Sequence, residues 1–166
     1  MAKTNSFDVS TGVDLQEVDN AVNQAHKEIR QRYDFKGSNC TLEFLRKEGA
    51  LQLEADDEYR LQALLQVLRE KLVRRGVPVK NLDEGPIETG SLGRARQRLG
   101  LKQGIDEETA RRMNKDIRGQ GFSKVQVQTQ GDELRVSSPS RDSLQEVIQF
   151  LKGQDYDIEL KFGNYR

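Results

Sequence analysis

Apolar side chains recur along this chain at two different spacings, which predict where helices and strands lie. Spacings of three and four residues, as in Leu15, Val18 and Val22, are typical of a helix with one buried face. Strict alternation of apolar and polar residues, as in Leu51-Gln52-Leu53, is typical of a strand. The predicted helices are 14–33, 61–76, 106–119 and 140–153, and the predicted strands are 6–10, 40–46, 50–55, 77–80, 94–102, 124–130, 133–138 and 157–162.

These elements follow the order β-α-β-β-α-β twice, which predicts an α+β protein with two ferredoxin-like βαββαβ domains in tandem. In this fold two helices cover one face of a four-stranded antiparallel sheet and the other face stays open. Pro86 and several glycines mark a connection between the two copies. We therefore expect an N-terminal domain at 1–85, a linker at 86–93 and a C-terminal domain at 94–166.

One predicted strand carries a row of positive charge. At a period of two residues, Arg94, Arg96, Arg98 and Lys102 project to one face of strand 94–102. The whole chain is neutral, with 27 basic and 27 acidic residues, so this local excess needs an explanation. One explanation is a site for an anionic ligand such as a nucleotide. The other is that glutamates on neighbouring strands pair with the arginines, and the pattern alone leaves both open.

The residue types that most enzymes and metal sites need are scarce. His26 is the only histidine and Cys40 the only cysteine, which is too few for an internal disulfide or a usual zinc site. No phosphate-binding P-loop sequence occurs, and the clustered acids at 56–58 and 106–108 stand at predicted helix starts, where capping explains them. The sequence therefore predicts a protein that is not an enzyme and holds no metal or cofactor.

Nothing in the chain predicts a membrane location. No apolar run approaches the roughly 18 residues that span a bilayer, and the first residues lack the apolar core of a signal peptide. With a single cysteine as well, we expect a cytoplasmic protein.

The open sheet faces are expected to present guanidinium and amide groups rather than aromatic rings. Arginine offers a planar fork of donors to phosphate oxygens, and glutamine amides bond base edges or sugar hydroxyls. Terminal residues usually fray, but inward-facing Phe162 favours a chain end, Lys161–Arg166, that is tied down and forms one wall of a cleft. The candidate nucleotide-binding residues are Arg96, Arg98, Lys102, Gln103, Gln126, Gln130, Arg135, Arg141 and Arg166.

Eight segments in register resemble one known family, the YajQ-like bacterial nucleotide-binding proteins. The segments are Ser6–Ser10, Val13–Val18, Arg32–Gly37, Leu101–Ile105, Lys124–Gln128, Gln130–Glu133, Ser140–Asp142 and Phe162–Arg166. The resemblance covers nearly the whole chain and implies a cytosolic, non-enzymatic protein that binds nucleotides. Pro139 stands where the family commonly has a basic residue, which leaves Arg141 as the cation at that helix start.

The resemblance also implies that the two domains exchange their first strands. Strand 6–10 would then lie in the C-terminal sheet and strand 94–102 in the N-terminal sheet. In that arrangement Arg96 and Arg98 would neighbour Glu54 and Gln52, and Asp8 would approach Arg135. Cross-strand pairing would neutralise part of the positive row.

Together with the candidate donors, the resemblance implies a regulatory protein that binds a purine nucleotide or a cyclic dinucleotide. One alternative is an RNA-binding module for tRNA or other structured RNA, against which the neutral net charge counts. A second alternative is a cyclic-dinucleotide effector that acts through protein partners.

Overall fold

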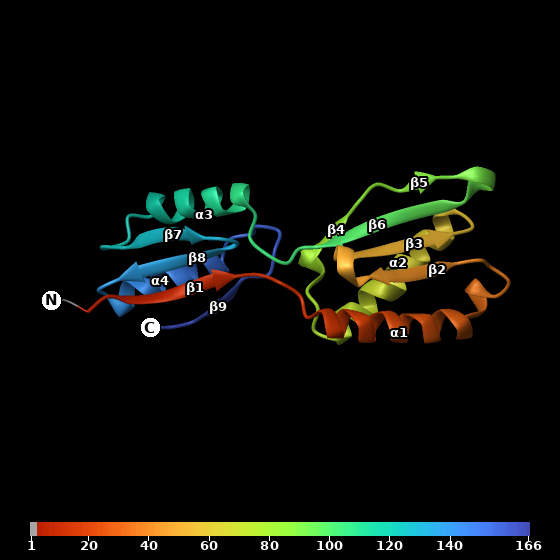
Figure 1. The fold of residues 1–166 in the computed structure, drawn as a ribbon, viewed down its shortest axis with the longest axis horizontal. Helices are drawn as coiled ribbons and strands as arrows, with labels where there is room; N and C mark the ends of the chain where they lie inside the picture. Colours follow the sequence, from red (N-terminus) through yellow and green to blue (C-terminus); the bar gives the residue numbers. More distant parts are fainter. Residues whose placement is uncertain (1–2) are drawn as a thin grey trace. The chain divides into compact units, whose positions relative to one another are not determined.

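The computed structural model describes residues 3–166, which form two separately packed units (Figure 1). The N-terminal unit is Val13–Lys102, and the C-terminal unit combines residues 3–12 with Gln103–Arg166. The chain therefore passes from one unit to the other twice, after Gly12 and after Lys102.

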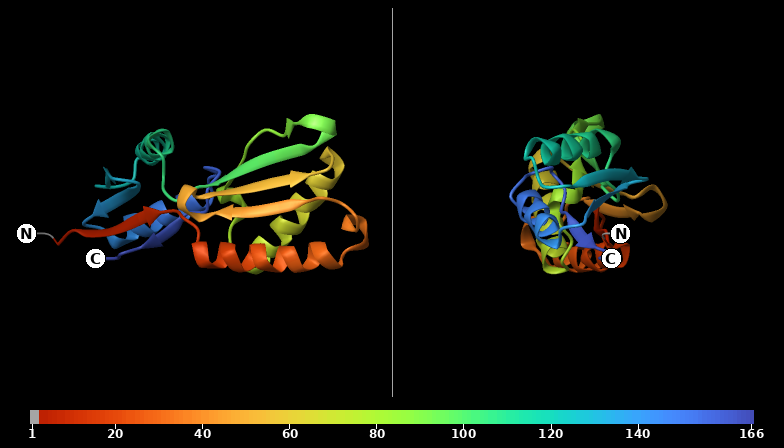
Figure 2. Two further views of the ribbon diagram at one scale, coloured as in Figure 1. Left: turned by 45° about the vertical axis from the view of Figure 1, so that its right-hand side comes forward. Right: turned by 90° about the vertical axis from the view of Figure 1, so that its left-hand side faces the viewer.

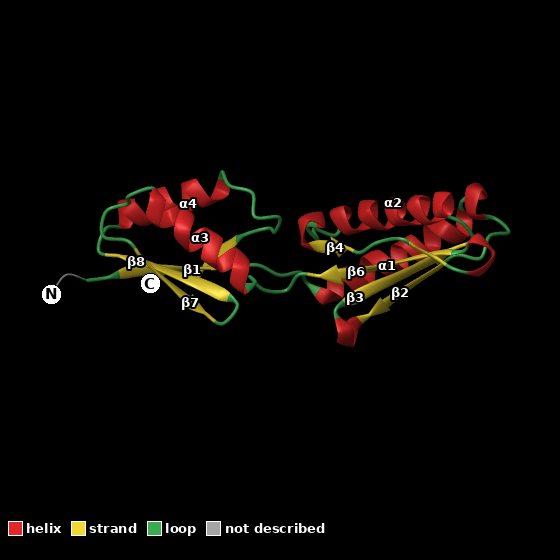
Figure 3. Ribbon diagram, turned by 90° about the horizontal axis from the view of Figure 1, so that it is seen from above, coloured by secondary structure: helices red, strands yellow, loops and turns green. Residues whose placement is uncertain are grey.

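In the N-terminal unit, two helices cover one face of a mixed-length antiparallel sheet (Figure 3). The strands lie in the order β2-β3-β6-β4, with β5 pairing β6 beyond this path. Fully buried leucines such as Leu51, Leu53 and Leu99 meet Leu61 and Leu68 of the second helix in one core. The elements are α1 (Leu15–Gln31), β2 (Thr41–Leu45), β3 (Ala50–Ala55), α2 (Glu58–Arg74), β4 (Leu82–Glu84), β5 (Glu88–Thr89) and β6 (Ala95–Leu101).

The C-terminal unit repeats this plan with the strand order β7-β8-β1-β9. Its core is closed by Phe7 and Val9 from the first strand, which meet Met113, Leu134 and Leu151. The elements are β1 (Asn5–Ser10), α3 (Glu107–Gly119), β7 (Gln126–Gln130), β8 (Glu133–Ser138), α4 (Arg141–Lys152) and β9 (Lys161–Gly163).

The exchange of first strands is confirmed. Strand β1 lies between β8 and β9, so the red start of the chain runs among the blue strands of the C-terminal unit (Figure 2). Strand β6 lies between β3 and β4 in the N-terminal unit. Both sheets have the ferredoxin-like strand order with their central first strand supplied from the other half of the sequence, which confirms the predicted fold class.

The short strand predicted at 77–80 was wrong. Residues Val79–Asn81 form a 3₁₀ turn, and the edge strand β4 begins at Leu82 instead. Asn81 is fully buried, and its side-chain amide donates a 2.9 Å hydrogen bond to the carbonyl oxygen of Lys102. The backbone N–H of Lys102 also donates to the Asn81 carbonyl oxygen, so both bonds hold the 3₁₀ turn against the end of β6. Pairing of β4 with β6 begins after this turn, at Leu82.

The segment expected to be an interdomain linker, 86–93, is part of the N-terminal unit. Strand β5 pairs Glu88 with Arg96 and Thr89 with Ala95, and a 3₁₀ turn at Ser91–Gly93 leads back into β6. Glycine and proline are common both in hairpin connections and in interdomain linkers, so composition could not show which of the two this segment is.

None of the helices in the described part of the chain combines the length and the apolar character that a bilayer crossing requires.

Candidate functional site

The positive row of β6 lies on the open face of the N-terminal sheet, as predicted. Ala95, Gln97 and Leu99 are buried toward the helices, whereas the side chains of Arg96 and Arg98 are 59% and 52% exposed. Arg96 stands opposite Glu54 and Arg98 opposite Gln52 on β3, which is the register that the strand exchange implies.

Every arginine of this row is engaged by a carboxylate. The shortest pairs are Arg94 Nη1 with Asp56 Oδ1 at 3.0 Å, Arg96 Nε with Glu88 Oε2 at 2.9 Å and Arg98 Nη2 with Glu48 Oε2 at 3.4 Å. The structure therefore favours the second explanation of the row, in which neighbouring acids neutralise it.

A hollow of about 550 Å³ lies over this face, and its charge does not suit a phosphate. Its lining includes Glu54, Asp83 and Glu88 beside Arg96 and Arg98, so carboxylates outnumber guanidiniums. Lys102 lies at the end of β6, where its ammonium group faces the carbonyl oxygen of Lys80 at 3.5 Å.

A second set of candidates lies on the open face of the C-terminal sheet. Exposed Gln126 and Gln130 flank this face on β7 and stand opposite Ser137 and Glu133 on β8. Gln103 lies beside Gly12, where a Cβ atom on the glycine would come within 3.2 Å of the Gln103 side-chain oxygen.

Arg135, at the centre of the same face, forms an ion pair with Asp8. Its Nε donates to Asp8 Oδ1 at 3.0 Å, and Asn164 donates to the other carboxylate oxygen at 2.6 Å. The hydrogen bond from Arg135 holds the pKa of the Asp8 carboxyl below its usual value, and the bond from Asn164 acts in the same direction. The predicted approach of Asp8 to Arg135 is thus confirmed, and it reduces the capacity of Arg135 to bind phosphate.

The remaining two candidates, Arg141 and Arg166, lie beside one pocket of about 360 Å³. The pocket lies between α4, the start of β1 and the end of the chain. Backbone hydrogen bonds in both directions between Ser6 and Arg166, at 3.1 and 3.0 Å, tie this chain end to β1. The expectation that the end is tied down and walls a cleft is confirmed.

This pocket combines two positively charged side chains with aromatic and apolar surface. Arg141 donates to the neutral side-chain oxygen of Asn5 at 3.4 Å, and across residues 3–166 neither it nor Arg166 lies within ion-pair distance of a side-chain carboxylate. Tyr165 is 63% exposed, and its ring centroid lies 6.3 Å from that of buried Phe7. With Leu144 and Ile148 also in the lining, the pocket offers a planar apolar surface next to two guanidiniums.

The structure thus divides the nine candidates among separate surfaces. Arg96 and Arg98 share one face, Gln126, Gln130 and Arg135 share another, and Arg141 and Arg166 share the pocket. Tyr165 was missed as a candidate. Its position next to the last residue, in the segment predicted to wall a cleft, was the signal that pointed to it.

His26 and Cys40, the only histidine and cysteine of the sequence, both make contacts within the N-terminal unit. A ring nitrogen of His26 on α1 lies 2.7 Å from the carbonyl oxygen of Leu42 on β2. Cys40 is half-buried and packs against the N-terminal core, with its sulfur 3.5 Å from the hydroxyl of Ser38.

Comparison with known proteins gives a consistent result over the whole chain. The family model described as "Nucleotide-binding protein YajQ-like" matches residues 5–166. A nucleotide-binding protein of Chloroherpeton thalassium is 43% identical over 166 residues, which is the full length of both chains. A nucleotide-binding protein of Trichlorobacter lovleyi is 47% identical over 161 residues, covering 97% of this chain and 98% of its own. One from Alkaliphilus oremlandii is 45% identical over the full length of both.

Proposed function

This chain belongs to the YajQ-like family of nucleotide-binding proteins, and we propose that it binds a purine nucleotide or a cyclic dinucleotide in the pocket of Arg141, Tyr165 and Arg166. The observation that carries the proposal is that two guanidiniums, neither within ion-pair distance of a side-chain carboxylate of residues 3–166, lie beside an exposed aromatic ring. The base stacks on Tyr165 over the apolar floor, and the arginines hold the phosphate.

The choice of this pocket over the β6 face rests on electrostatics. Exposed ion pairs such as Arg96 with Glu88 are worth only about 0–1 kcal/mol, so a phosphate could displace the carboxylate at small cost. The displaced carboxylates would nevertheless stay within a few ångströms and repel the phosphate. Within residues 3–166, no aspartate or glutamate side chain lines the pocket, so this repulsion is weaker there.

Helix α4 adds to the attraction for an anion. Arg141 is its first residue, and the first backbone N–H groups of a helix favour negative charge. Asp142 in the same turn limits this effect. We therefore assign the main attraction to the two side chains.

We further propose that binding regulates the protein and that the bound nucleotide is not transformed. Among the described residues, no side chain that lines the pocket is a carboxylate, imidazole or thiol that could act as a general base or nucleophile. A nucleotide that is bound but not transformed leaves the site occupied in proportion to its concentration. Such a site can regulate the protein in the cytoplasm, where we expect it to act and where nucleotides are abundant.

The test is calorimetric titration of the full chain with ATP, GTP and cyclic diguanylate. We expect saturable binding of at least one of them, weakened about 5–100-fold by Tyr165→Ala and about tenfold by Arg141→Gln. Arg98→Gln on β6 is the matched control and leaves the affinity unchanged. Loss of binding in the control, with the pocket variants unaffected, would move the site to the β6 face.

RNA binding is a second candidate, supported by exposed cations on α3. Lys115 and Arg118 lie there with Arg111 around a shallow hollow. Raising salt from 50 to 200 mM would weaken RNA bound through six or more phosphates by roughly a thousandfold or more, because counterions condensed on the RNA are released on binding. A free nucleotide has no such condensed counterions, so its affinity should depend much less on salt. A steep salt slope for a structured RNA would favour this candidate.

A further inference from the structure

We infer that the outer edge of β7 is a docking site for an extended acidic peptide segment of another protein, which adds a fifth strand to the C-terminal sheet. This inference is independent of nucleotide binding, because it uses a different wall of the C-terminal unit.

Backbone geometry leaves hydrogen-bonding groups of β7 facing outward. The strand pairs only with β8, and the two-residue turn Gly131-Asp132 makes Gln130 and Glu133 the closing pair. In such a hairpin the closing pair is hydrogen-bonded and bonded pairs alternate along the ladder. The N–H and C=O groups of Val127 and Thr129 therefore point away from β8, and across residues 3–166 no backbone hydrogen bond outside the strand ladders uses them.

This edge lacks the protection that the other sheet edges carry. Strand β2 has Glu43 within it, β4 is three residues long with two acids, and β9 is three residues long with Lys161. Residues 125–130, by contrast, read Val-Gln-Val-Gln-Thr-Gln, with neither charge nor proline, in a chain that is 33% charged. Charge, proline and short length are the usual means of preventing unwanted strand pairing, so their absence here indicates an edge that is open to a partner strand.

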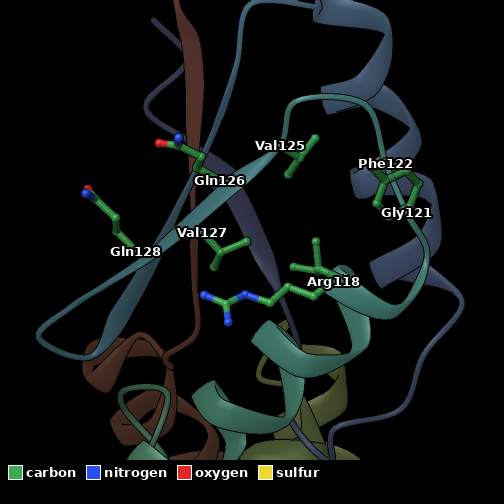
Figure 4. A pocket seen from close by; sticks show the side chains of 8 residues that line it. Arg118, Gly121, Phe122, Val125, Gln126, Val127 and Gln128 are labelled. Atoms are coloured by element: carbon green, nitrogen blue, oxygen red, sulfur yellow. The ribbon is translucent and has the colours of Figure 1, made fainter.

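A groove alongside the edge provides room for the partner's side chains. It has a volume of about 420 Å³ and lies between β7 and the end of α3. Val125 and Val127 point into this space together with Phe122, whereas Gln126 and Gln128 point to the other side (Figure 4). A strand added to β7 would place alternate side chains over these half-buried apolar groups, as in other complexes formed by strand addition.

The charge around the groove identifies the partner as acidic. Arg118 reaches along the groove beside Val127 (Figure 4), and Lys124 stands just before the strand. No aspartate or glutamate lines the groove. A second copy of this chain fits less well, because antiparallel β7–β7 pairing around Val127 would bring two Arg118 side chains together without an acid between them.

The experiment uses the ¹⁵N-labelled full chain and the synthetic peptide acetyl-Glu-Val-Thr-Val-Thr-Val-Glu-amide. We expect saturable NMR shift changes confined to 122–130 and slower hydrogen exchange at the Val127 and Thr129 amides. The same peptide with all internal amides N-methylated keeps its side chains but cannot pair, and it should not bind. Equal binding of both peptides, or shifts that map elsewhere, would overturn the inference.

Charge reversal supplies a second, independent arm. Arg118→Glu should weaken the glutamate peptide about tenfold or more, and the lysine counterpart acetyl-Lys-Val-Thr-Val-Thr-Val-Lys-amide should regain that affinity. Arg111→Glu, on the same helix but outside the groove lining, is the matched control and should leave the peptide affinity nearly unchanged. If both variants bind the two peptides alike, or if the free protein dimerises through β7, the acidic-peptide assignment is wrong.

Discussion

At the scale of single residues, Asp8 joins three segments that are far apart in the sequence. Its side chain, 14% exposed, lies on β1 and accepts hydrogen bonds from Arg135 on β8 and from Asn164 just after β9. This carboxylate therefore holds β1, the first strand exchanged into the C-terminal unit, against its neighbours. Asp8 is therefore expected to matter for the stability of the C-terminal unit more than an exposed acid would.

Replacing this carboxylate with an amide should destabilise the C-terminal unit in a pH-dependent way. Asp8→Asn should cost about 1–3 kcal/mol at pH 7, because two donors lose their charged acceptor. The folded-state pKa of Asp8 is lowered, so its stabilisation is present above the unfolded value near 3.9 and is lost as the pH falls through the folded value. Urea unfolding at pH 7 and pH 3 checks this, with Glu146→Gln on the surface of α4 as the control. An equal loss at both pH values would contradict the account.

The sequence identified charged residues correctly but could not choose their partners. Glu17 stands three positions after the N-cap Asp14, where a capping partner would stand, yet its carboxylate accepts 2.9 and 3.0 Å hydrogen bonds from Arg75, 58 positions away. Arg96 was expected to neighbour Glu54, and it does, but its 2.9 Å ion pair is with Glu88. Glu88 lies in β5, inside the segment taken for a linker, so no cross-strand argument could include it.

At the scale of elements, one ion pair is built into the packing of α1 against α2. Lys71 of α2 is only 8% exposed, and its ammonium lies 2.9 Å from the Glu28 carboxylate of α1. That hydrogen bond holds the pKa of Glu28 below its usual value, against the opposing effect of burial. The contact between α1 and α2 therefore includes an ion pair beside its apolar side chains.

The two halves of this ion pair should respond differently to substitution. Glu28→Ala should destabilise the N-terminal unit by about 1–3 kcal/mol, since it leaves the Lys71 ammonium without its partner; partial exposure of Glu28 keeps the figure below that of a fully buried pair. Lys71→Met, which keeps the volume and removes the charge, should stay within about 1 kcal/mol of the parent. Thermal unfolding at pH 7 compares them, and equal losses would show that packing rather than charge governs the site.

The periodicity of apolar residues predicted the helices and the central strands correctly, but it did not predict where the strands begin and end. Strand β7 begins two residues later than predicted, after Lys124 with φ 54°, and β9 begins well after Asp157 with φ 60°. Left-handed backbone ends a strand, and glycine is the residue that usually announces it. Because Lys124 and Asp157 are not glycines, neither strand boundary could be predicted from the residue type.

At the scale of the whole molecule, the exchange of first strands means that neither half of the sequence is a folding unit. The N-terminal sheet needs β6 between β3 and β4, and the C-terminal sheet needs β1 between β8 and β9. Cutting the chain at the compositional boundary near residue 86 would remove the central strand from both sheets. The resemblance to a family predicted this, and periodicity alone did not, because either assignment of the strands buries the same apolar faces.

Two fragments of nearly equal length should therefore behave in opposite ways. Residues 13–102 contain every strand of the N-terminal sheet and should unfold cooperatively in urea, with dispersed NMR signals. Residues 1–85 keep both helices but lack β6, which leaves the inner edges of β3 and β4 without their shared neighbour. A cooperative transition for 1–85 together with none for 13–102 would refute this division.

The pocket of Arg141, Tyr165 and Arg166 is the central functional claim, and NMR of the ¹⁵N-labelled full chain titrated with GTP or ATP tests it most directly. We predict saturable shift changes that centre on Ser6, Phe7, Leu144, Tyr165 and Arg166. Shifts that centre instead on Arg96 and Arg98 of β6, with the pocket residues unmoved, would contradict it.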